Sequence, residues 1–388
     1  MDRVSIHSVA QMREQARRYL PRMIFDFVDG GAEREITLRA NLDDFEAVRF
    51  RPRTLVDVGN VDLSAQVLGE RIDRPLMIAP MGLCGVVRPQ GELALARAAA
   101  RAGMPFVLST AASYSIEEVA EAAPGNLWFQ LYLFRDPGLR GAFIERAREA
   151  GYRALVVTVD LARGGKREKD LRNGFTVPVR WRPHNAVDFA THPRWALRML
   201  PHRGMTLGNL KGFGAGGDDV MALSTFMNTQ IDPSVGWSDL ESLRAQWDLP
   251  LLVKGVLSPE DASRAVELGA DGIIVSNHGG RQLDGAPSTI SALPAIADAV
   301  GGRADLILDG GIRRGADVVK ALALGARACM IGKAALYGLA AAGEAGVDQV
   351  IDLLSREIDV AMALSGRART EDLDRQAVRA PGEWFEAA

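Results

Sequence analysis

Residues 276–283 read Ser-Asn-His-Gly-Gly-Arg-Gln-Leu, and the apolar, β-branched run before them predicts a buried parallel strand over 272–276. His278 and Arg281 therefore stand where a strand ends and a loop begins. Histidine can take up a proton near neutral pH, and arginine can clamp a carboxylate or stabilise a developing oxyanion. Together they indicate chemistry at a carbon that bears a hydroxyl group beside a carbonyl group. A lone histidine is more often structural, but the polar residues at the other strand ends favour a catalytic one.

Eight short β-rich runs alternate along the chain with segments of helical periodicity, such as 92–102 and 259–268. Alternating strands and helices predict a parallel sheet, and eight such units predict an α/β fold of the closed (β/α)8 type, the TIM barrel. A doubly wound sheet is the alternative, but the number of units favours the barrel. The runs are 75–79, 105–109, 127–132, 154–160, 250–254, 272–276, 305–309 and 328–332.

Polar residues at the ends of these runs would form a ring at the mouth of the barrel, where the loops of this fold build active sites. The seventh run ends in Asp309-Gly-Gly-Ile-Arg313, and Gly332-Lys333 follows the eighth. Glycines let backbone N–H groups approach an anion, so this arrangement predicts a phosphate site rather than two plain turns. Lys254, at the end of the fifth run, has two interpretations. It could form a Schiff base, or it could place positive charge beside an electron-rich cofactor ring.

We expect a single domain over residues 1–388, with the barrel in residues 75–366. Residues 1–74 are expected to form an N-terminal helical cap, with helices over 8–19 and 21–31. The segment 161–239, after the fourth run, is far too long for an ordinary βα loop, which indicates a functional or partly disordered insertion.

The first half of this insertion, residues 179–211, mixes basic side chains with Trp, Phe, Met and Leu and contains one acid, Asp188. Such a mixture suits an anionic membrane surface. The alternative is an active-site lid whose basic face is solvated. The glycine-rich tail, residues 212–219, is expected to be mobile. The basic residues are Arg180, Arg182, Arg194, Arg198, Arg203 and Lys211.

The composition is that of an ordinary globular protein. The 388 residues carry a formal net charge of -3, which gives no case for nucleic-acid binding. Two cysteines, Cys84 and Cys329, cannot build a disulfide framework and fit a reducing compartment. No metal site, signal peptide or transmembrane helix is expected. These features predict a cytoplasmic protein, with a peripheral position on the inner face of the cell membrane if the insertion binds lipid.

The chain resembles the FMN-dependent (S)-2-hydroxy-acid oxidoreductases, which include glycolate oxidase, flavocytochrome b2, and lactate and mandelate dehydrogenases. The resemblance runs from Leu20-Pro21 to Met362–Gly366, and Ser276–Gln282 carries its most specific signature. It implies FMN as cofactor and oxidation of a bulky or aromatic (S)-2-hydroxy acid, mandelate- or lactate-like, to the 2-oxo acid. The likeness is greatest to the mandelate dehydrogenase branch, in Pro105–Ala111, Leu127–Tyr132, Asn173–Phe175 and His192–Trp195.

The resemblance also implies roles around the substrate. His278 would be the base that takes the hydroxyl or α proton, and Asp160 would stabilise the imidazolium that results. Arg281 and Arg167 would hold the substrate carboxylate, and Tyr132 would bond to the substrate oxygen. Whether hydrogen leaves as hydride or through a carbanion stays open.

The cofactor contacts that the resemblance implies surround the flavin. Lys254 would lie near flavin N1 and stabilise the reduced anion, and Asp309 would bind ribityl hydroxyls. The remaining contacts are Ser109, Gln130, Thr158 and Ser276 at the ring edge and ribityl chain, the backbone of Pro80, Met81 and Gly82 facing N5, and Gly310, Gly311, Arg313, Gly332 and Lys333 around the phosphate.

Four residues depart from the family pattern. Phe27 stands where the family has a substrate-binding tyrosine, so a phenol donor to the carboxylate is missing. A neutral substrate such as L-pantoyl lactone is therefore an alternative. Ala111 replaces the tryptophan of glycolate oxidase and enlarges the pocket. Met81 adds bulk beside the flavin, and Lys333 loses the bidentate fork of the usual arginine.

Two acceptors and a second enzyme class stay open. The electrons could pass to a quinone, which the basic insertion favours, or to O2 as in a hydroxy-acid oxidase. A phosphosugar aldolase with a Schiff base on Lys254 is the alternative of another class. The expected partners are therefore a small 2-hydroxy acid or lactone and an electron acceptor. A homotetramer is expected by analogy with relatives.

Overall fold

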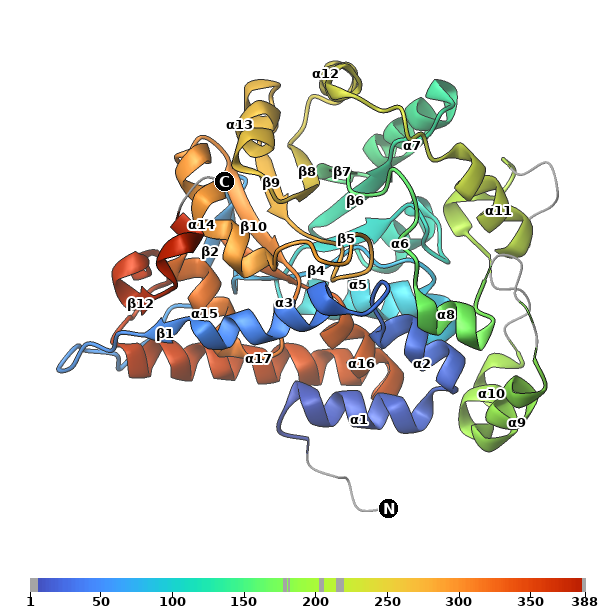
Figure 1. The fold of residues 1–388 in the computed structure, drawn as a ribbon, viewed down its shortest axis with the longest axis horizontal. Coiled ribbons are helices and arrows are strands. Elements are labelled where there is room, and N and C mark those ends of the chain that lie inside the picture. Colours follow the sequence, from blue (N-terminus) through green and yellow to red (C-terminus); the bar gives the residue numbers. More distant parts are fainter. Residues whose placement is uncertain (1–5, 177–179, 181, 202–205, 214–219, 386–388) are drawn as a thin grey trace.

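The computed structural model describes residues 6–176, 180, 182–201, 206–213 and 220–385. Eight parallel strands close into a barrel surrounded by helices (Figure 1), so the predicted (β/α)8 fold is confirmed. The ring closes because β11 pairs with both β10 and β4. The strands are β4 (Leu76–Ile78), β5 (Phe106–Ser109), β6 (Leu127–Tyr132), β7 (Ala154–Thr158), β8 (Leu251–Val256), β9 (Gly272–Val275), β10 (Asp305–Asp309) and β11 (Ala328–Ile331).

Helices on the outside of the barrel connect these strands, and local signals mark where they begin. Ser115 and Glu118 form a capping box at the start of α6, and Ser258 caps α13, which has Pro259 at its first position. The helices are α5 (Gly91–Arg101), α6 (Ile116–Ala122), α7 (Pro137–Glu149), α12 (Trp237–Gln246), α13 (Pro259–Glu267), α14 (Thr289–Val300), α15 (Gly315–Ala323), α16 (Lys333–Ala342) and α17 (Glu344–Ser365).

Two apolar clusters follow from the period-two geometry of the strands. Alternate strand residues point outward and pack against the helices. The others point inward and fill the barrel. The inward cluster includes Met77, Val107, Trp128, Val156, Leu252, Ile274, Ile307 and Met330.

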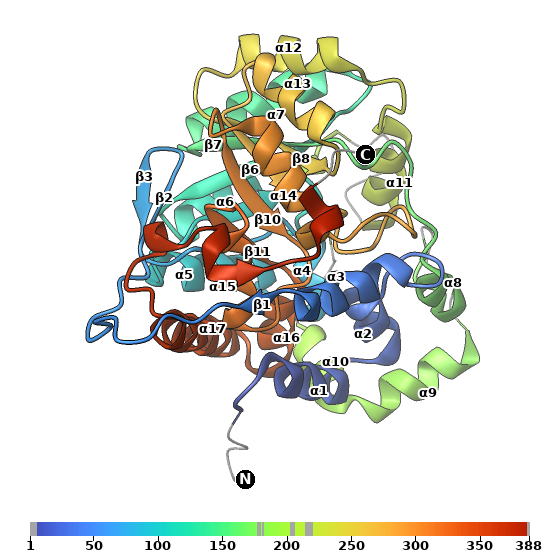
Figure 2. The same cartoon turned by 60° about the vertical axis from the view of Figure 1, so that its left-hand side comes forward.

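A hairpin of β2 (Ala65–Val67) and β3 (Glu70–Ile72), visible beside the barrel in Figure 2, covers the amino ends of the strands. Val67 and Ile72 pack into the interior cluster. The Leu68 amide donates to Oδ2 of Asp305, the first residue of β10, over 2.6 Å. The hairpin was not anticipated from the sequence. It leaves the carboxyl ends of the strands as the accessible end of the barrel.

The remaining N-terminal elements pack around the barrel. The helix expected over 8–19 is α1 (Val9–Tyr19), which Ser8 caps, and the one expected over 21–31 is α2 (Arg22–Asp29). They are followed by α3 (Ile36–Ala47) and by β1 (Arg49–Phe50), which pairs with β12 (Val378–Arg379) near the other end of the chain. The region before the barrel is thus helical at its start and partly β after it.

The described parts of the insertion after β7 are largely helical. Its helices α9 and α10 lie beside α1 and α2 (Figures 1 and 2). The Arg22 amide donates to Asp188 over 2.6 Å, and Trp195 Nε1 donates to the Val86 carbonyl over 3.1 Å. Arg203 and most of the tail expected to be mobile, residues 214–219, lie outside the described residues. The short elements are α4 (Cys84–Val87), α8 (Glu168–Asn173), α9 (Pro183–Thr191), α10 (Pro193–Met199), η1 (Gly208–Leu210), α11 (Val220–Gln230), η2 (Thr370–Asp372), η3 (Arg375–Ala377) and η4 (Gly382–Phe385).

Candidate active site

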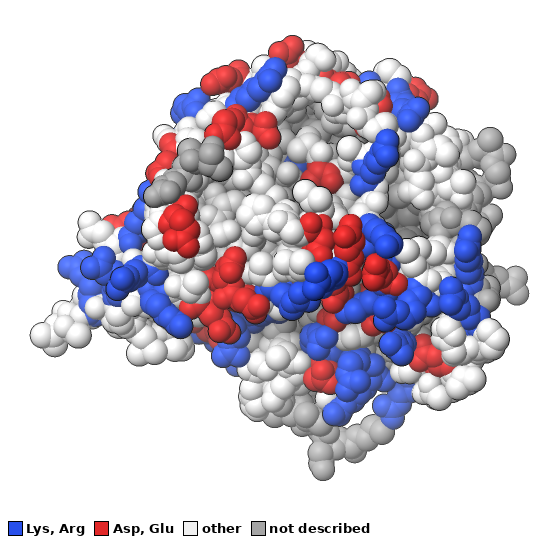
Figure 3. Space-filling model, viewed as in Figure 1, with Lys and Arg blue, Asp and Glu red and all other residues white. Residues whose placement is uncertain are grey.

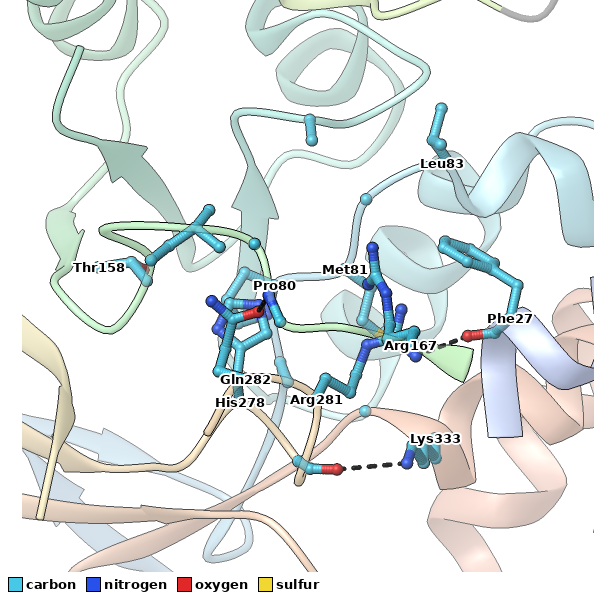
Figure 4. A pocket seen from close by; sticks show the side chains of 18 of the residues that line it. Phe27, Pro80, Met81, Leu83, Thr158, Arg167, His278, Arg281, Gln282 and Lys333 are labelled. Carbon is cyan, nitrogen blue, oxygen red and sulfur yellow. Dashed lines mark hydrogen bonds between the residues drawn. The ribbon is translucent and has the colours of Figure 1, made fainter. Parts of the chain in front are cut away.

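A cavity of about 1060 Å³ opens at the carboxyl ends of the barrel strands. Figure 4 shows His278, Arg281, Arg167 and Phe27 around it. The structure brings most of the predicted site residues together here, while Asp160, Ser109 and Ser276 lie one layer behind its wall. The predicted residues that line the cavity are Phe27, Pro80, Met81, Gly82, Ala111, Gln130, Tyr132, Thr158, Arg167, Lys254, His278, Arg281, Asp309, Gly310, Gly311, Arg313, Gly332 and Lys333.

Strand periodicity explains why polar side chains gather at this end. In most of the strands, the residue two positions after the inward apolar layer points to the same side and is polar. These residues are buried, and lone polar groups in such places are costly unless they find partners. They are Ser109, Gln130, Thr158, Lys254, Ser276 and Asp309.

His278 and Asp160 form a hydrogen-bonded histidine–carboxylate pair beside the cavity. His278 Nδ1 lies 2.9 Å from Asp160 Oδ1, and the His278 amide donates to Ser276 Oγ over 3.1 Å. Burial opposes ionisation of Asp160, but the charge of His278 and its hydrogen bond outweigh burial and lower the pKa of the Asp160 carboxyl. Because Asp160 occupies Nδ1, Nε2 is the ring nitrogen left to accept a proton. His278 also has φ of 59°, a strained conformation that is common at functional sites.

Gly255 makes room for Asp160. A β-bulge in β8 falls between Lys254 and Val256, and Gly255 within it has φ of 103°. A Cβ atom on Gly255 would lie 2.7 Å from both Cβ and Cγ of Asp160. The missing side chain therefore allows Asp160 to reach His278.

We expect Gly255→Ala to slow substrate reduction of the flavin by roughly ten- to a hundred-fold, because small displacements of catalytic groups have effects of this size. The measurement is anaerobic stopped-flow absorbance. Gly151→Ala is the matched control, since Gly151 has φ of 77° but an added Cβ would meet nothing within 4 Å. Equal effects of the two substitutions would contradict a specific role of Gly255.

Two arginines from different loops meet at the Phe27 ring. The guanidinium carbons of Arg281 and Arg167 lie 5.1 Å and 6.0 Å from its centroid. Arg281 Nη1 donates to the Phe27 carbonyl over 2.6 Å, and Arg167 pairs with the buried Asp170 at 3.1 Å. Burial and the neighbouring charge of Arg167 lower the pKa of Arg281 to about 9. Two cations held this close favour an anion between them.

A second cationic region lies at the glycine-rich end of the cavity. Burial, together with the charges of Arg281 and Arg313, lowers the pKa of Lys333. Lys333 Nζ donates to the carbonyls of Gly30 and Gly279 over 3.1 and 3.3 Å. Gly311 has φ of 84°, and a Cβ there would lie 1.9 Å from the Asn41 carbonyl oxygen. This close backbone packing with nearby cations suits a phosphate group.

Comparison with known proteins shows the family. The model of the FMN-dependent dehydrogenase family matches residues 16–380. The chain belongs to this family. It is 47% identical over 368 residues to an L-lactate dehydrogenase of Caulobacter vibrioides (strain NA1000 / CB15N), which covers 93% of this chain and 94% of that protein. It is 46% identical over 368 residues to an L-lactate oxidase of Nostoc sp. (strain PCC 7120 / SAG 25.82 / UTEX 2576), with 94% and 95% covered.

A solved structure of similar fold is that of the monotopic membrane protein (S)-mandelate dehydrogenase. Its TM-score is 0.94 at 43% identity, over 97% of this chain and 100% of that one. The predicted family, the FMN cofactor and the class of 2-hydroxy-acid oxidoreductase are therefore confirmed.

The cavity fits FMN by its unpaired polar atoms. Gln130 Nε2 and Thr158 Oγ1 are buried and have no hydrogen-bond partner among the described residues, and both residues line the cavity. Such atoms are rare in folded proteins and suit a heteroatom-rich ring. Lys254 Nζ lies 2.5 Å from Asp309 Oδ2 and 2.7 Å from Ser276 Oγ, which orients its charge at the same wall.

Two of the serines expected at the cofactor, Ser109 and Ser276, lie behind the cavity wall. The Ser109 hydroxyl donates to Gln130 Oε1 over 3.1 Å, and the Ser276 hydroxyl donates to Asp309 Oδ2 over 2.8 Å. Both serines support side chains that line the cavity instead of lining it themselves. The physical reason is that the longer side chains of Gln130 and Lys254 reach past them.

Several residues of the site were not predicted. Asp170 pairs with Arg167, Phe175 lies 4.5 Å from Phe27 between ring centroids, and Met227 of α11 lines the cavity. They belong to the insertion, and no local pattern in the sequence indicates which of its residues reach the cavity. Gln282 is the last residue of the signature at Ser276–Gln282, but the sequence alone indicated no role for it.

Proposed function

We propose that this protein uses FMN to oxidise an (S)-2-hydroxy acid to the 2-oxo acid. The observation that carries the proposal is that one cavity is lined by His278, backed by Asp160, and by the paired guanidiniums of Arg281 and Arg167. The arginines bind the substrate carboxylate and so orient the adjacent carbon. His278 Nε2 takes the hydroxyl proton as the Cα–H bond breaks and the C–O single bond becomes a double bond; the Cα hydrogen and the two electrons of its bond leave toward the cofactor site. FMN, when bound, takes up the two electrons that this oxidation releases.

The other polar residues assist this reaction. Burial and the charge of Asp160 raise the pKa of Tyr132, so its phenol keeps its proton and donates to the substrate oxygen. The charge of Lys254 would lie beside the flavin ring, and the hydrogen bonds of its Nζ to Asp309 and Ser276 hold it there. The backbone of Pro80, Met81 and Gly82 would face the flavin ring. The phosphate would be held by Gly310, Gly311, Gly332, Arg313 and Lys333. In the aldolase alternative, Lys254 would need a free amine, whereas Nζ is paired with Asp309.

The two arginines favour an acid over a lactone as substrate. Asp170, which pairs with Arg167, offsets part of the repulsion between Arg281 and Arg167. A substrate carboxylate would offset more of it, whereas an uncharged lactone would not. Phe27 lacks the phenol donor of the family's tyrosine, but its ring contacts both guanidinium groups through cation–π interactions. Ala111 leaves space for a bulky substituent on the substrate.

Phe27→Tyr tests the lost donor. We expect the substitution to tighten binding of (S)-mandelate about tenfold, because a hydrogen bond to a charged group is worth about 1.5 kcal/mol or more. Binding of L-pantoyl lactone should change less, since the lactone carries no charge. The dependence of the flavin reduction rate on ligand concentration, measured by anaerobic stopped-flow mixing, gives the apparent dissociation constant of each ligand and so this difference. Equal tightening of both ligands would show that the side chain at position 27 does not respond to the charge of the substrate, and would contradict the neutral-substrate alternative.

We propose a quinone in the membrane as the electron acceptor, with the insertion as a peripheral contact on the inner face of the cell membrane. The apolar side chains of Val187, Leu197 and Leu200 on α9 and α10 are 66%, 66% and 72% exposed. Basic side chains such as Arg17, Arg18 and Arg22 are exposed on α1 and α2, which lie in the lower part of the face in Figure 3. Among the described residues, no helix has the length and apolar character needed to cross a bilayer.

The whole chain, 1–388, is proposed to act as one domain and to assemble as a homotetramer. Sedimentation with anionic lipid vesicles tests the membrane contact, and light scattering tests the assembly.

An alternative acceptor is O2, because the L-lactate oxidase named above is 46% identical to this chain. Formation of hydrogen peroxide at the rate of turnover in air would support the oxidase.

The decisive experiment on the proposed function is anaerobic bleaching of the visible flavin spectrum. (S)-Mandelate, L-lactate and L-pantoyl lactone are tested side by side on the purified holoenzyme. Fast bleaching by either acid supports the proposal. Bleaching by the lactone alone would make the neutral substrate correct, and a colourless protein would contradict the use of FMN.

A further inference from the structure

Gln282 joins the two loops that carry the reactive side chains. Its Nε2 donates to the backbone carbonyls of Asp160 and Arg163 over 2.9 and 3.1 Å. Its Oε1 accepts from the Gly165 amide over 3.1 Å. All three bonds run from the loop after β9 to the loop after β7. One amide side chain therefore binds three backbone positions across that contact.

Gly165 fits against the same place. A Cβ on Gly165 would lie 2.3 Å from the Arg281 carbonyl oxygen and 2.7 Å from Gln282 Cα. The two backbones thus approach each other more closely than any side chain at position 165 would allow. We call this contact, made by Gln282 and Gly165, the loop clasp.

Each loop of the clasp carries half of the proposed machinery. The loop after β9 holds His278 and Arg281, and the loop after β7 holds Asp160 and Arg167. The histidine–carboxylate pair and the arginine pair each need one residue from either loop. A change in the distance between the loops would therefore disturb both pairs together.

We infer that Gln282 is a positioning residue, which holds Asp160 against His278 and Arg167 beside Arg281 through the loop clasp. The inference rests on the proposed function for what the two pairs do. The amide is required because both a donor and an acceptor are needed at once. Glutamate has the same shape but places an oxygen against the carbonyls of Asp160 and Arg163.

The clasp itself is tested without any substrate. Hydrogen–deuterium exchange of residues 160–167 is compared between the wild-type holoenzyme, Gln282→Ala and Leu283→Ala. Leu283 is the matched control, since its side chain is 73% exposed in the same loop. We expect faster exchange in this segment, including the Gly165 amide, in Gln282→Ala only. Unchanged exchange in Gln282→Ala would overturn the inference, whatever the substrate is.

The effect on the reaction is tested by flavin reduction with (S)-mandelate. Gln282→Ala is expected to slow reduction of the flavin by about 10²-fold, with FMN retained. It should also weaken binding of phenylglyoxylate, the 2-oxo acid that corresponds to mandelate. In Gln282→Glu, the facing carbonyls of Asp160 and Arg163 favour the protonated carboxyl and raise its pKa above the usual value of about 4.3. The reduction rate of this variant should therefore recover relative to wild type as the pH falls from about 8 to about 5, because a protonated carboxyl regains a donor. The ratio of the Gln282→Ala reduction rate to the wild-type reduction rate should not change with pH.

Parallel pH profiles of the two variants would overturn the positioning role. If Gln282→Ala does not fold, the isosteric Gln282→Glu carries both the exchange and the pH test. Failure of the wild type itself to be bleached by any hydroxy acid would contradict the proposed function alone, and the exchange result would still decide the clasp.

Discussion

Glutamine in place of His278 is expected to slow flavin reduction by an (S)-2-hydroxy acid about 10²- to 10⁴-fold while FMN stays bound. This range is the usual contribution of a positioned general base. Glutamine keeps a polar side chain of moderate size but cannot accept the hydroxyl proton at neutral pH. Asp160 would then stabilise no imidazolium, although its carboxylate remains. Stopped-flow bleaching under anaerobic conditions gives the rate, and the visible spectrum of the purified protein gives the FMN content.

A second histidine provides the control. His192 belongs to the insertion and lies outside the cavity lining. Its Nδ1 lies 3.4 Å from Oδ1 of the Asp188 carboxylate. His192→Gln therefore removes a similar His–Asp contact with no expected change in the reduction rate. If His278→Gln is reduced about as fast as wild type, His278 is not the base.

Methionine in place of Arg281 is expected to weaken binding of phenylglyoxylate by about 30-fold or more. Loss of one partner from a buried charge pair costs about 2–5 kcal/mol, and 1.4 kcal/mol corresponds to tenfold in affinity. Methionine keeps an unbranched chain over the Phe27 ring and removes only the charge and its donors. Titration of the flavin spectrum with phenylglyoxylate measures the dissociation constant.

Charge dependence distinguishes a carboxylate clamp from a general loss of packing. Binding of L-pantoyl lactone should weaken much less than binding of the acid. Arg264→Met is the control, because Arg264 also covers an aromatic ring, 4.8 Å from the Trp237 centroid, but lies outside the cavity. If Arg281→Met weakens binding of the acid and of the lactone equally, Arg281 does not bind the carboxylate.

Local patterns determined much of this protein. The eight apolar runs predicted the eight barrel strands, because a strand that is buried on both faces appears in the sequence as a short continuous apolar run. The polar residues at the ends of these runs predicted that Gln130, Thr158 and Lys254 lie at one end of the barrel. The signature at Ser276–Gln282 placed His278 and Arg281 beside a strand end, and glycines before Arg313 indicated the phosphate region. These features depend on neighbouring residues only.

Contacts between distant segments were decided by the tertiary structure alone. Asp160 lies behind His278 because the bulge at Gly255 leaves space, and no local pattern reveals which atoms will fill it. Arg167 reaches Arg281 through a loop that Gln282 holds by its backbone. The hairpin at Ala65–Ile72 covers one end of the barrel because apolar interior side chains there need cover. Loop positions follow from such nonlocal packing and hydrogen bonds, whereas each apolar strand run is encoded by neighbouring residues.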